Sequence, residues 1–403
     1  MFKNVIFSSV AKFFLVFSLV LFFAADKTAL SVQTGTEAAV WERFSAFDEE
    51  SNVKINHAPL TELLDGTVLN VGRSKERLSR AKAKRYRESH ITYGNTSPSR
   101  YEGNRVMFHA FSEDHKVFLK SYIEGLERLS ERRPIISISR DEQLAYWLNL
   151  HNLMVLDLLA TEYPVKSLKA IRLGSSRQQA QWDVKRVTVE GVPLSIRDIE
   201  MIVMKNWDDP RVIYGLYQGS IGGPSLPNYA FEAADVWDAL DYYTREFINS
   251  NRGVRPKGSK VDISIFYEWN MAAFDGSVEA LRRHIQDYAD EAFLGDISGL
   301  QRINFKYYDW TVADIMGGVL HGGRPNQLGG VLSSPEATNN DFSFYQQFFP
   351  IGGGTEALPP QALELMTEIL INNDVPRRTP VVTVEPCGVG ECQVDEPEPD
   401  PEQ

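Results

Sequence analysis

The arrangement of apolar positions singles out one stretch of the chain, from Asp141 to Leu168, which reads DEQLAYWLNLHNLMVLDLLATEYPVKSL. Wound at about 100° per residue, this stretch places apolar residues on nearly every side. One face carries Leu144, Trp147, Leu148, His151, Met154, Val155 and Leu158, and the other carries Tyr146, Leu150 and Leu153. A helix without a clean polar face is usually buried. The pattern therefore predicts a buried central helix over 141–168.

Three polar residues, Asn149, His151 and Asn152, lie in the middle of this helix. An unpaired buried amide or imidazole costs about 1–3 kcal/mol. We therefore expect all three to find hydrogen-bond partners inside the protein.

Hydrophobic periodicity predicts elements on both sides of the central helix. Ser195 and Asp198 have the spacing of a capping box for the helix that ends near Asn206. His109 and His115 fall on different faces of their predicted helix, which disfavours a metal site there. The other predicted elements are helices over 36–47, 104–129, 233–249, 264–274 and 277–293, an amphipathic segment over 59–70, hairpins over 185–196 and around 257–258, a buried strand over 211–217 and a closing strand over 303–310.

The N-terminus has the order of a secretory signal peptide. Lys3 and Lys12 precede an uncharged run over 13–25, and small and polar residues follow. The run is shorter than the ~20 residues that span a bilayer. We expect cleavage near residues 25–31 and a periplasmic or secreted protein, with no stable membrane span after cleavage. An uncleaved anchor beginning near Val5 is the alternative.

The net charge of −12 argues against a nucleic-acid partner, because phosphate binding relies on a basic surface. One local stretch, over 73–87, holds eight Lys or Arg residues. It is either a solvated helical face or an arm for anionic lipid or polysaccharide.

The only two cysteines, Cys387 and Cys392, lie near the C-terminus with two glycines between them. This spacing suits a small disulfide loop in an oxidising compartment. A metal pair is disfavoured, since two thiols leave a tetrahedral site half empty. The chain ends in VDEPEPDPEQ, which alternates Pro with Asp and Glu, and we expect residues 386–403 to be disordered apart from that loop.

Six blocks of the chain resemble, in order and spacing, the domain of unknown function numbered 547. They read AYWLNLHN, EYPVKSL, VEGVPLSIRDIE, DDPRVIYGL, SIFYEWNMAAF and KYYDWTVAD. The resemblance covers roughly Trp41 to Asp314 and implies an exported bacterial-type member with a helix-rich α+β domain. We expect its buried central helix to pack on a small, mainly antiparallel sheet. The chain then divides into a signal peptide (1–31), this domain (36–316), an extension with one helix (317–385) and the acidic tail (386–403).

The chain departs from the family pattern where chemistry is expected. Relatives usually read IEH where this chain has Met201, and DPRIHF where it has Ile213. Relatives carry a cysteine in the loop that here reads QGSIGGPSLP. His151 stands where relatives generally have Tyr. Each of the first three changes removes a nucleophile, base or ligand.

Two functional interpretations fit this sequence pattern. A buried helix beside a small sheet is the layout of papain-like and transglutaminase-like thiol hydrolases, but no Cys precedes Cys387. A thiol-independent variant would use His151 as general base, with Asn149, Asn152 and Asp309 as orienting groups. These residues and Arg211 form our candidate polar cluster.

The favoured function is a non-catalytic binding or scaffolding module for another protein or a cell-wall component. No catalytic residue, metal or cofactor is assigned. The aromatic run over 342–349 is a candidate docking patch.

Overall fold

A computed structural model describes residues 41–73, 97–257, 260–295, 297, 302–318 and 365. Its longer helices are α2 (Ala58–Thr67), α4 (Glu113–Arg132), α5 (Arg140–Glu162), α7 (Ile196–Asn206), α8 (Val236–Ile248) and α10 (Val278–Tyr288), and its short ones are α6 (Lys169–Leu173), α9 (Ile265–Trp269) and α11 (Glu291–Leu294). The strands are β1 (Val68–Leu69), β2 (Arg105–Val106), β3 (Val187–Val189), β4 (Val192–Leu194), β5 (Val254–Lys257), β6 (Lys260–Ser264) and β7 (Ile303–Tyr307). The α+β class expected from the sequence is confirmed.

Helix α5 is the centre of the fold, as its apolar pattern predicts. Eighteen of its 23 residues are buried. Its N-terminus is capped by the Ser139 hydroxyl, which accepts a hydrogen bond from the backbone N–H of Glu142. The helix ends at Glu162, so our prediction of a helix as far as Leu168 was wrong. Pro164 is the reason, because a proline disfavours helical geometry in the residue before it, and Tyr163 is extended.

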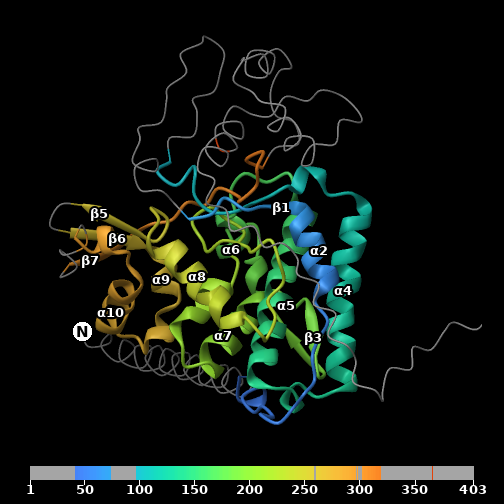
Figure 1. Cartoon of the computed structure of the whole chain (residues 1–403). Helices are drawn as coiled ribbons and strands as arrows, with labels where there is room; N and C mark the ends of the chain where they lie inside the picture. Colours follow the sequence, from blue (N-terminus) through green and yellow to red (C-terminus); the bar gives the residue numbers. More distant parts are fainter. Residues whose placement is uncertain are drawn as a thin grey trace, which may run out of the picture.

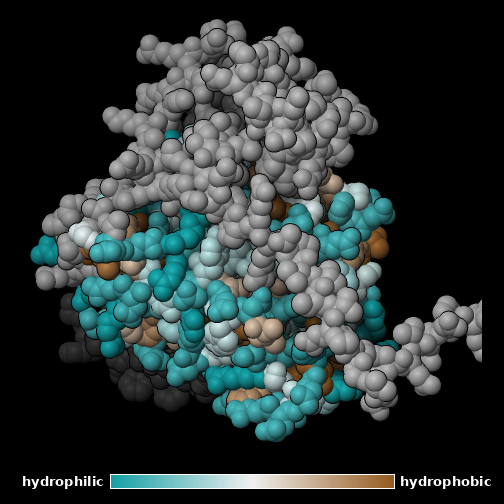
Figure 2. Space-filling view, viewed as in Figure 1, coloured by the Kyte–Doolittle hydropathy of each residue, from teal (hydrophilic) through white to brown (hydrophobic). Residues whose placement is uncertain are grey.

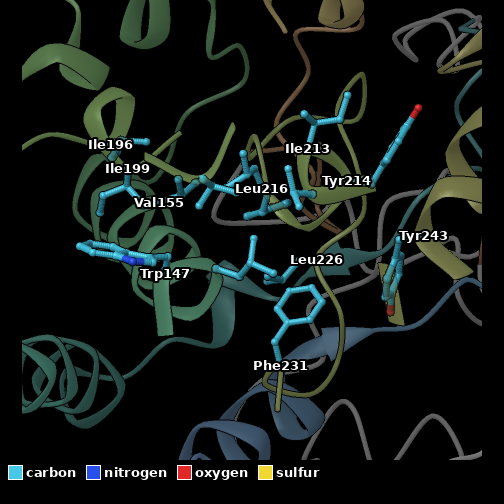
Figure 3. Close-up of a cluster of buried hydrophobic side chains, with 14 of the residues drawn as sticks. Trp147, Val155, Ile196, Ile199, Ile213, Tyr214, Leu216, Leu226, Phe231 and Tyr243 are labelled. Carbon is cyan, nitrogen blue, oxygen red and sulfur yellow. The ribbon is translucent and has the colours of Figure 1, made fainter. Parts of the chain in front are cut away.

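Helices rather than strands are the main neighbours of α5. Helices α4, α7 and α8 pack against it, and Figure 1 shows α4 along one side of the molecule with the β5–β6–β7 sheet at the opposite edge. The side chains between these helices form a continuous apolar core that includes Trp147, Ile199 and Leu216 (Figure 3). Figure 2 shows a largely hydrophilic surface on the described part of the face in view.

Strands contribute three small sheets in the part of the chain that the structure describes. Strands β1 and β2, and β3 and β4, form antiparallel pairs, as do β5 and β6. Strand β7 runs parallel to β6. Both hairpins expected from the sequence are present, and so is the closing strand, which ends at Tyr307.

A second, irregular set of strand-like contacts surrounds the segment after β7, residues 309–315. Isolated bridges join Thr311 to Ser167, Val312 to Ser220 and Asp314 to Val106. The segment therefore ties together the chain after α5, the glycine-rich loop 218–223 and β2. Two of the sequence blocks behind the family resemblance, EYPVKSL and KYYDWTVAD, contribute to this arrangement.

Other predicted elements also differ from the structure: the helix expected over 36–47 does not extend past Arg43, and the one expected over 277–293 is interrupted after Tyr288. Residues 211–217 were expected to be a buried strand but lie largely in a 3-10 helix, η4 (Pro210–Gly215), capped by the Asp209 carboxylate. Periodicity cannot separate a short buried strand from a short buried helix. The helix expected from residue 104 begins only at Glu113, because Ser112 and His115 form a capping box there.

No described helix is long and apolar enough to cross a membrane. Several predicted features lie outside the described residues. These are the expected signal peptide, the acidic tail, Cys387, Cys392, the aromatic run 342–349 and most of the basic stretch 73–87. Of the extension over 317–385, the structure describes only 317, 318 and the buried Leu365.

Candidate functional site

One group of buried polar side chains is centred on Glu200 of α7. One carboxylate oxygen, Oε1, accepts hydrogen bonds from Trp182 Nε1 at 3.1 Å, from Gln218 Nε2 at 3.1 Å and from Arg172 Nη1 at 3.3 Å. His151 Nε2 of α5 lies 3.6 Å from the same oxygen. We call these five residues the Glu200 cluster.

Four separate parts of the sequence besides α7 bring these side chains together. His151 comes from α5 and Arg172 from α6, Trp182 comes from the 3-10 turn η3 (Gln181–Asp183), and Gln218 lies in the glycine-rich loop. The Ser195–Asp198 capping box predicted from the sequence starts α7 and thereby orients Glu200 one turn later. The cluster depends on contacts between residues far apart in the chain.

The cluster is closed to solvent, and its side chains are bonded to one another except at His151 Nε2, which has no hydrogen-bond partner among the described residues. None of its five residues is more than 4% exposed. Gln218 bridges the ion pair, since its amide oxygen accepts from Arg172 while its Nε2 donates to Glu200 and to the carbonyl of Leu216. A buried ion pair is tolerated when such additional hydrogen bonds satisfy its polar atoms.

Neighbouring side chains keep the Glu200 carboxyl group ionised. Burial by itself raises the pKa of the carboxyl group, but Arg172 and His151 outweigh this effect and keep the pKa well below its usual range. Glu200 is therefore an anion at neutral pH. A general acid or base works best with a pKa near the working pH, so this carboxylate is poorly suited to proton transfer.

Aromatic rings enclose the cation of the cluster. The Arg172 guanidinium lies 5.0 Å from the ring centre of Trp182 and 4.7 Å from that of Trp269. Both distances are within the range of cation–π attraction. Trp269, at the end of α9, thus covers the buried ion pair.

Trp269 belongs to a group of three partly buried rings, Trp269, Tyr308 and Trp310, which we call the aromatic triad. The ring centres of Tyr308 and Trp310 are 4.6 Å apart, and those of Trp269 lie 4.8 Å from Tyr308 and 5.5 Å from Trp310. The Tyr308 hydroxyl is 2.7 Å from that of Ser220. The triad therefore sits between the Glu200 cluster and solvent.

The candidate polar cluster predicted from the sequence is only partly assembled. His151 Nδ1 donates to Asn152 Oδ1 at 2.9 Å, since that amide oxygen can only accept. The same oxygen accepts from the backbone N–H of Tyr217, and Asn152 Nδ2 donates to the carbonyl of Gly215. Asn149 makes a separate pair of bonds with the backbone of Phe231.

The other two members lie apart from these. Arg211 is paired with Asp209 at 2.7 Å and stacks on Trp237. Asp309 accepts from the Ser97 hydroxyl at 2.6 Å and from the backbone N–H of Thr311. The contacts place both residues in surroundings other than those of His151.

Sequence reasoning missed Glu200, Arg172, Trp182 and Gln218. Two signals were available: Glu200 directly precedes Met201, and Gln218 opens the glycine-rich loop, and both positions had been singled out in the sequence. Arg172 and Trp182 had no such signal. No group of three or more metal-ligating side chains occurs among the described residues.

Residues 135–248 match the model of the family described as "Protein of unknown function, DUF547". The matched segment contains all five residues of the Glu200 cluster, whereas the aromatic triad lies beyond it. This match supports the family resemblance read from the sequence blocks. Neither the curated proteins nor the solved structures contain a match to the chain.

Proposed function

We propose that this protein is an exported cell-envelope protein whose α+β domain binds a partner and does not catalyse hydrolysis. The observation that carries the proposal is the state of Glu200, a buried anion whose Oε1 accepts three hydrogen bonds within a closed cluster. Gln218 occupies the loop in which a thiol nucleophile is expected, and no cysteine precedes Cys387. The cluster then acts as a rigid support for the surface above it.

A hydrolase assay tests the non-catalytic part of this proposal. The purified protein is incubated with chromogenic ester, amide and glycoside substrates beside Glu200→Gln and His151→Ala variants. We expect turnover by the parent to equal that of both variants and of buffer. Hydrolysis by the parent that both folded variants lose would instead establish a thiol-independent hydrolase.

Export is tested in the native host. The charged and apolar order of the N-terminus favours removal of roughly the first 25 to 31 residues. Intact-mass spectrometry of the envelope or secreted fraction should find the shortened chain, with Cys387 and Cys392 oxidised to a disulfide. Full-length protein retained in the cytoplasm would refute export.

A further inference from the structure

The aromatic triad is held rigidly at the surface. Trp269 and Tyr308 pack against the hydrophobic core, and the carbonyl of Trp310 accepts a hydrogen bond from the backbone N–H of Leu168 at 2.9 Å. The Tyr308 hydroxyl is tied to Ser220. A surface that is already ordered loses little conformational entropy when a ligand binds.

The charges near the triad are already balanced. Arg172, under Trp269, is paired with Glu200. Asp309, between Tyr308 and Trp310 in the chain, is bonded to a hydroxyl and a backbone N–H. The surface therefore offers aromatic rings beside polar groups. Neither Arg172 nor Asp309 presents an unpaired charge to a ligand there.

This balance decides which class of ligand fits. A cationic ligand would compete with Arg172, which already lies against Trp269. An anionic ligand would be repelled by the net charge of −12. A neutral ligand with both an apolar face and a polar rim meets neither obstacle.

We propose that the aromatic triad is a binding site for a neutral oligosaccharide. A pyranose ring presents polarised C–H groups on one face, which suit the negative face of an aromatic ring, and hydroxyl groups at its rim, which suit the oxygens of Ser97 and Asp309. The ring planes are inclined by 48–59° to one another, so successive sugars would meet a stepped surface. This inference rests on the proposed binding function and names its ligand.

The test uses the full-length protein and two defined probes, the tetrasaccharides of β-1,4-linked N-acetylglucosamine and of β-1,4-linked glucose. Isothermal titration calorimetry measures the dissociation constant of each for the parent and for Trp310→Ala. Trp310 is chosen because it is partly exposed and, unlike Trp269 and Tyr308, is not among the rings packed against the hydrophobic core. We expect saturable binding of at least one probe and weakening by about tenfold or more in the variant, by analogy with the loss of a stacking ring.

The matched control is Trp237→Ala, which removes another partly buried tryptophan, on α8, outside the triad. Both variants are compared at a temperature below their melting transitions, and Trp310→Phe should retain part of the affinity. Equal affinity of the parent and Trp310→Ala, or no saturable binding of either probe, would overturn the oligosaccharide site. The hydrolase and export experiments test the proposed function separately, so that function can survive this failure.

Discussion

At the scale of single residues, His151 illustrates how the interior constrains a polar side chain. It is fully buried, its Nδ1 is bonded to Asn152, and its Nε2 faces Glu200. Asn152 in turn holds the backbone of Gly215 and Tyr217. His151 thus links α5 to the Glu200 cluster and to the chain that leads into the glycine-rich loop.

Replacing this residue should reduce stability. His151→Ala removes a buried ring and a hydrogen bond, so we expect a loss of about 2–4 kcal/mol in the free energy of unfolding. His151→Tyr should cost less, because the family resemblance implies that the surrounding shape accepts a phenol at this position. Urea denaturation midpoints measure the stability of both variants. The control is Val117→Ala, at a position 61% exposed, whose free energy of unfolding should stay within about 0.5 kcal/mol of the parent's. Equal stability of His151→Ala and the parent would contradict a structural role.

At the scale of elements, close packing between the glycine-rich loop and the segment after β7 brings the triad over the Glu200 cluster. The backbone N–H of Gly222 donates to the carbonyl of Asp309, and that of Ile221 donates to Thr311. A Cβ on Gly222 would lie 2.5 Å from the backbone nitrogen of Asp309. Only glycine allows this approach without displacing one of the two segments.

Two glycine substitutions should therefore have opposite effects. Gly222→Ala forces the backbone segments apart, and we expect a loss of about 1–3 kcal/mol. Gly125→Ala lies inside α4, where a Cβ meets no atom within 4 Å, and should stabilise the protein by about 0.5–1 kcal/mol through helix propensity. Thermal and urea unfolding of both variants measures the difference. A neutral Gly222→Ala would show that the loop is not tightly packed.

At the scale of the whole molecule, buried carboxyl groups make stability depend on pH in two directions. The lowered pKa of Glu200 gives stabilisation that is lost as the pH falls through that pKa. Asp314 behaves oppositely. Burial raises its pKa to about 6, although Oδ2 accepts from the backbone N–H groups of Met316 and Gly318.

The folded protein consequently binds the proton of Asp314 more tightly than the unfolded chain does. This stabilisation is complete below about pH 4, the value for a free Asp, and is lost as the pH rises through about 6. Asp314→Asn keeps an acceptor oxygen and removes the ionisation. We expect it to be more stable than the parent at pH 7 by on the order of 2 kcal/mol, and the difference to shrink towards pH 4.

Urea unfolding of Asp314→Asn and the parent at several pH values between 4 and 7 measures this difference directly. Comparing the two proteins cancels the contributions of other carboxyl groups, such as Glu142 and Asp157, whose pKa values burial also raises. A constant difference across this range would show that Asp314 does not titrate there.

The sequence by itself determined the elements that depend on local pattern. The apolar residues on nearly every side of α5 predicted its burial, Ser195 and Asp198 predicted the start of α7, and alternating valines predicted the β3–β4 hairpin. Each of these signals lies within one continuous stretch of chain, where side-chain spacing and backbone geometry are directly linked.

Only the tertiary structure decided which side chains meet. Glu200 lies 28 residues from Arg172 and 49 from His151 along the chain, yet all three meet in one buried cluster. Asp309 and Arg211, which the sequence grouped with His151, have other partners. Periodicity gives the face of a helix on which a residue lies but not the neighbour opposite that face. That neighbour is set by how α5, α6, α7 and the glycine-rich loop pack together.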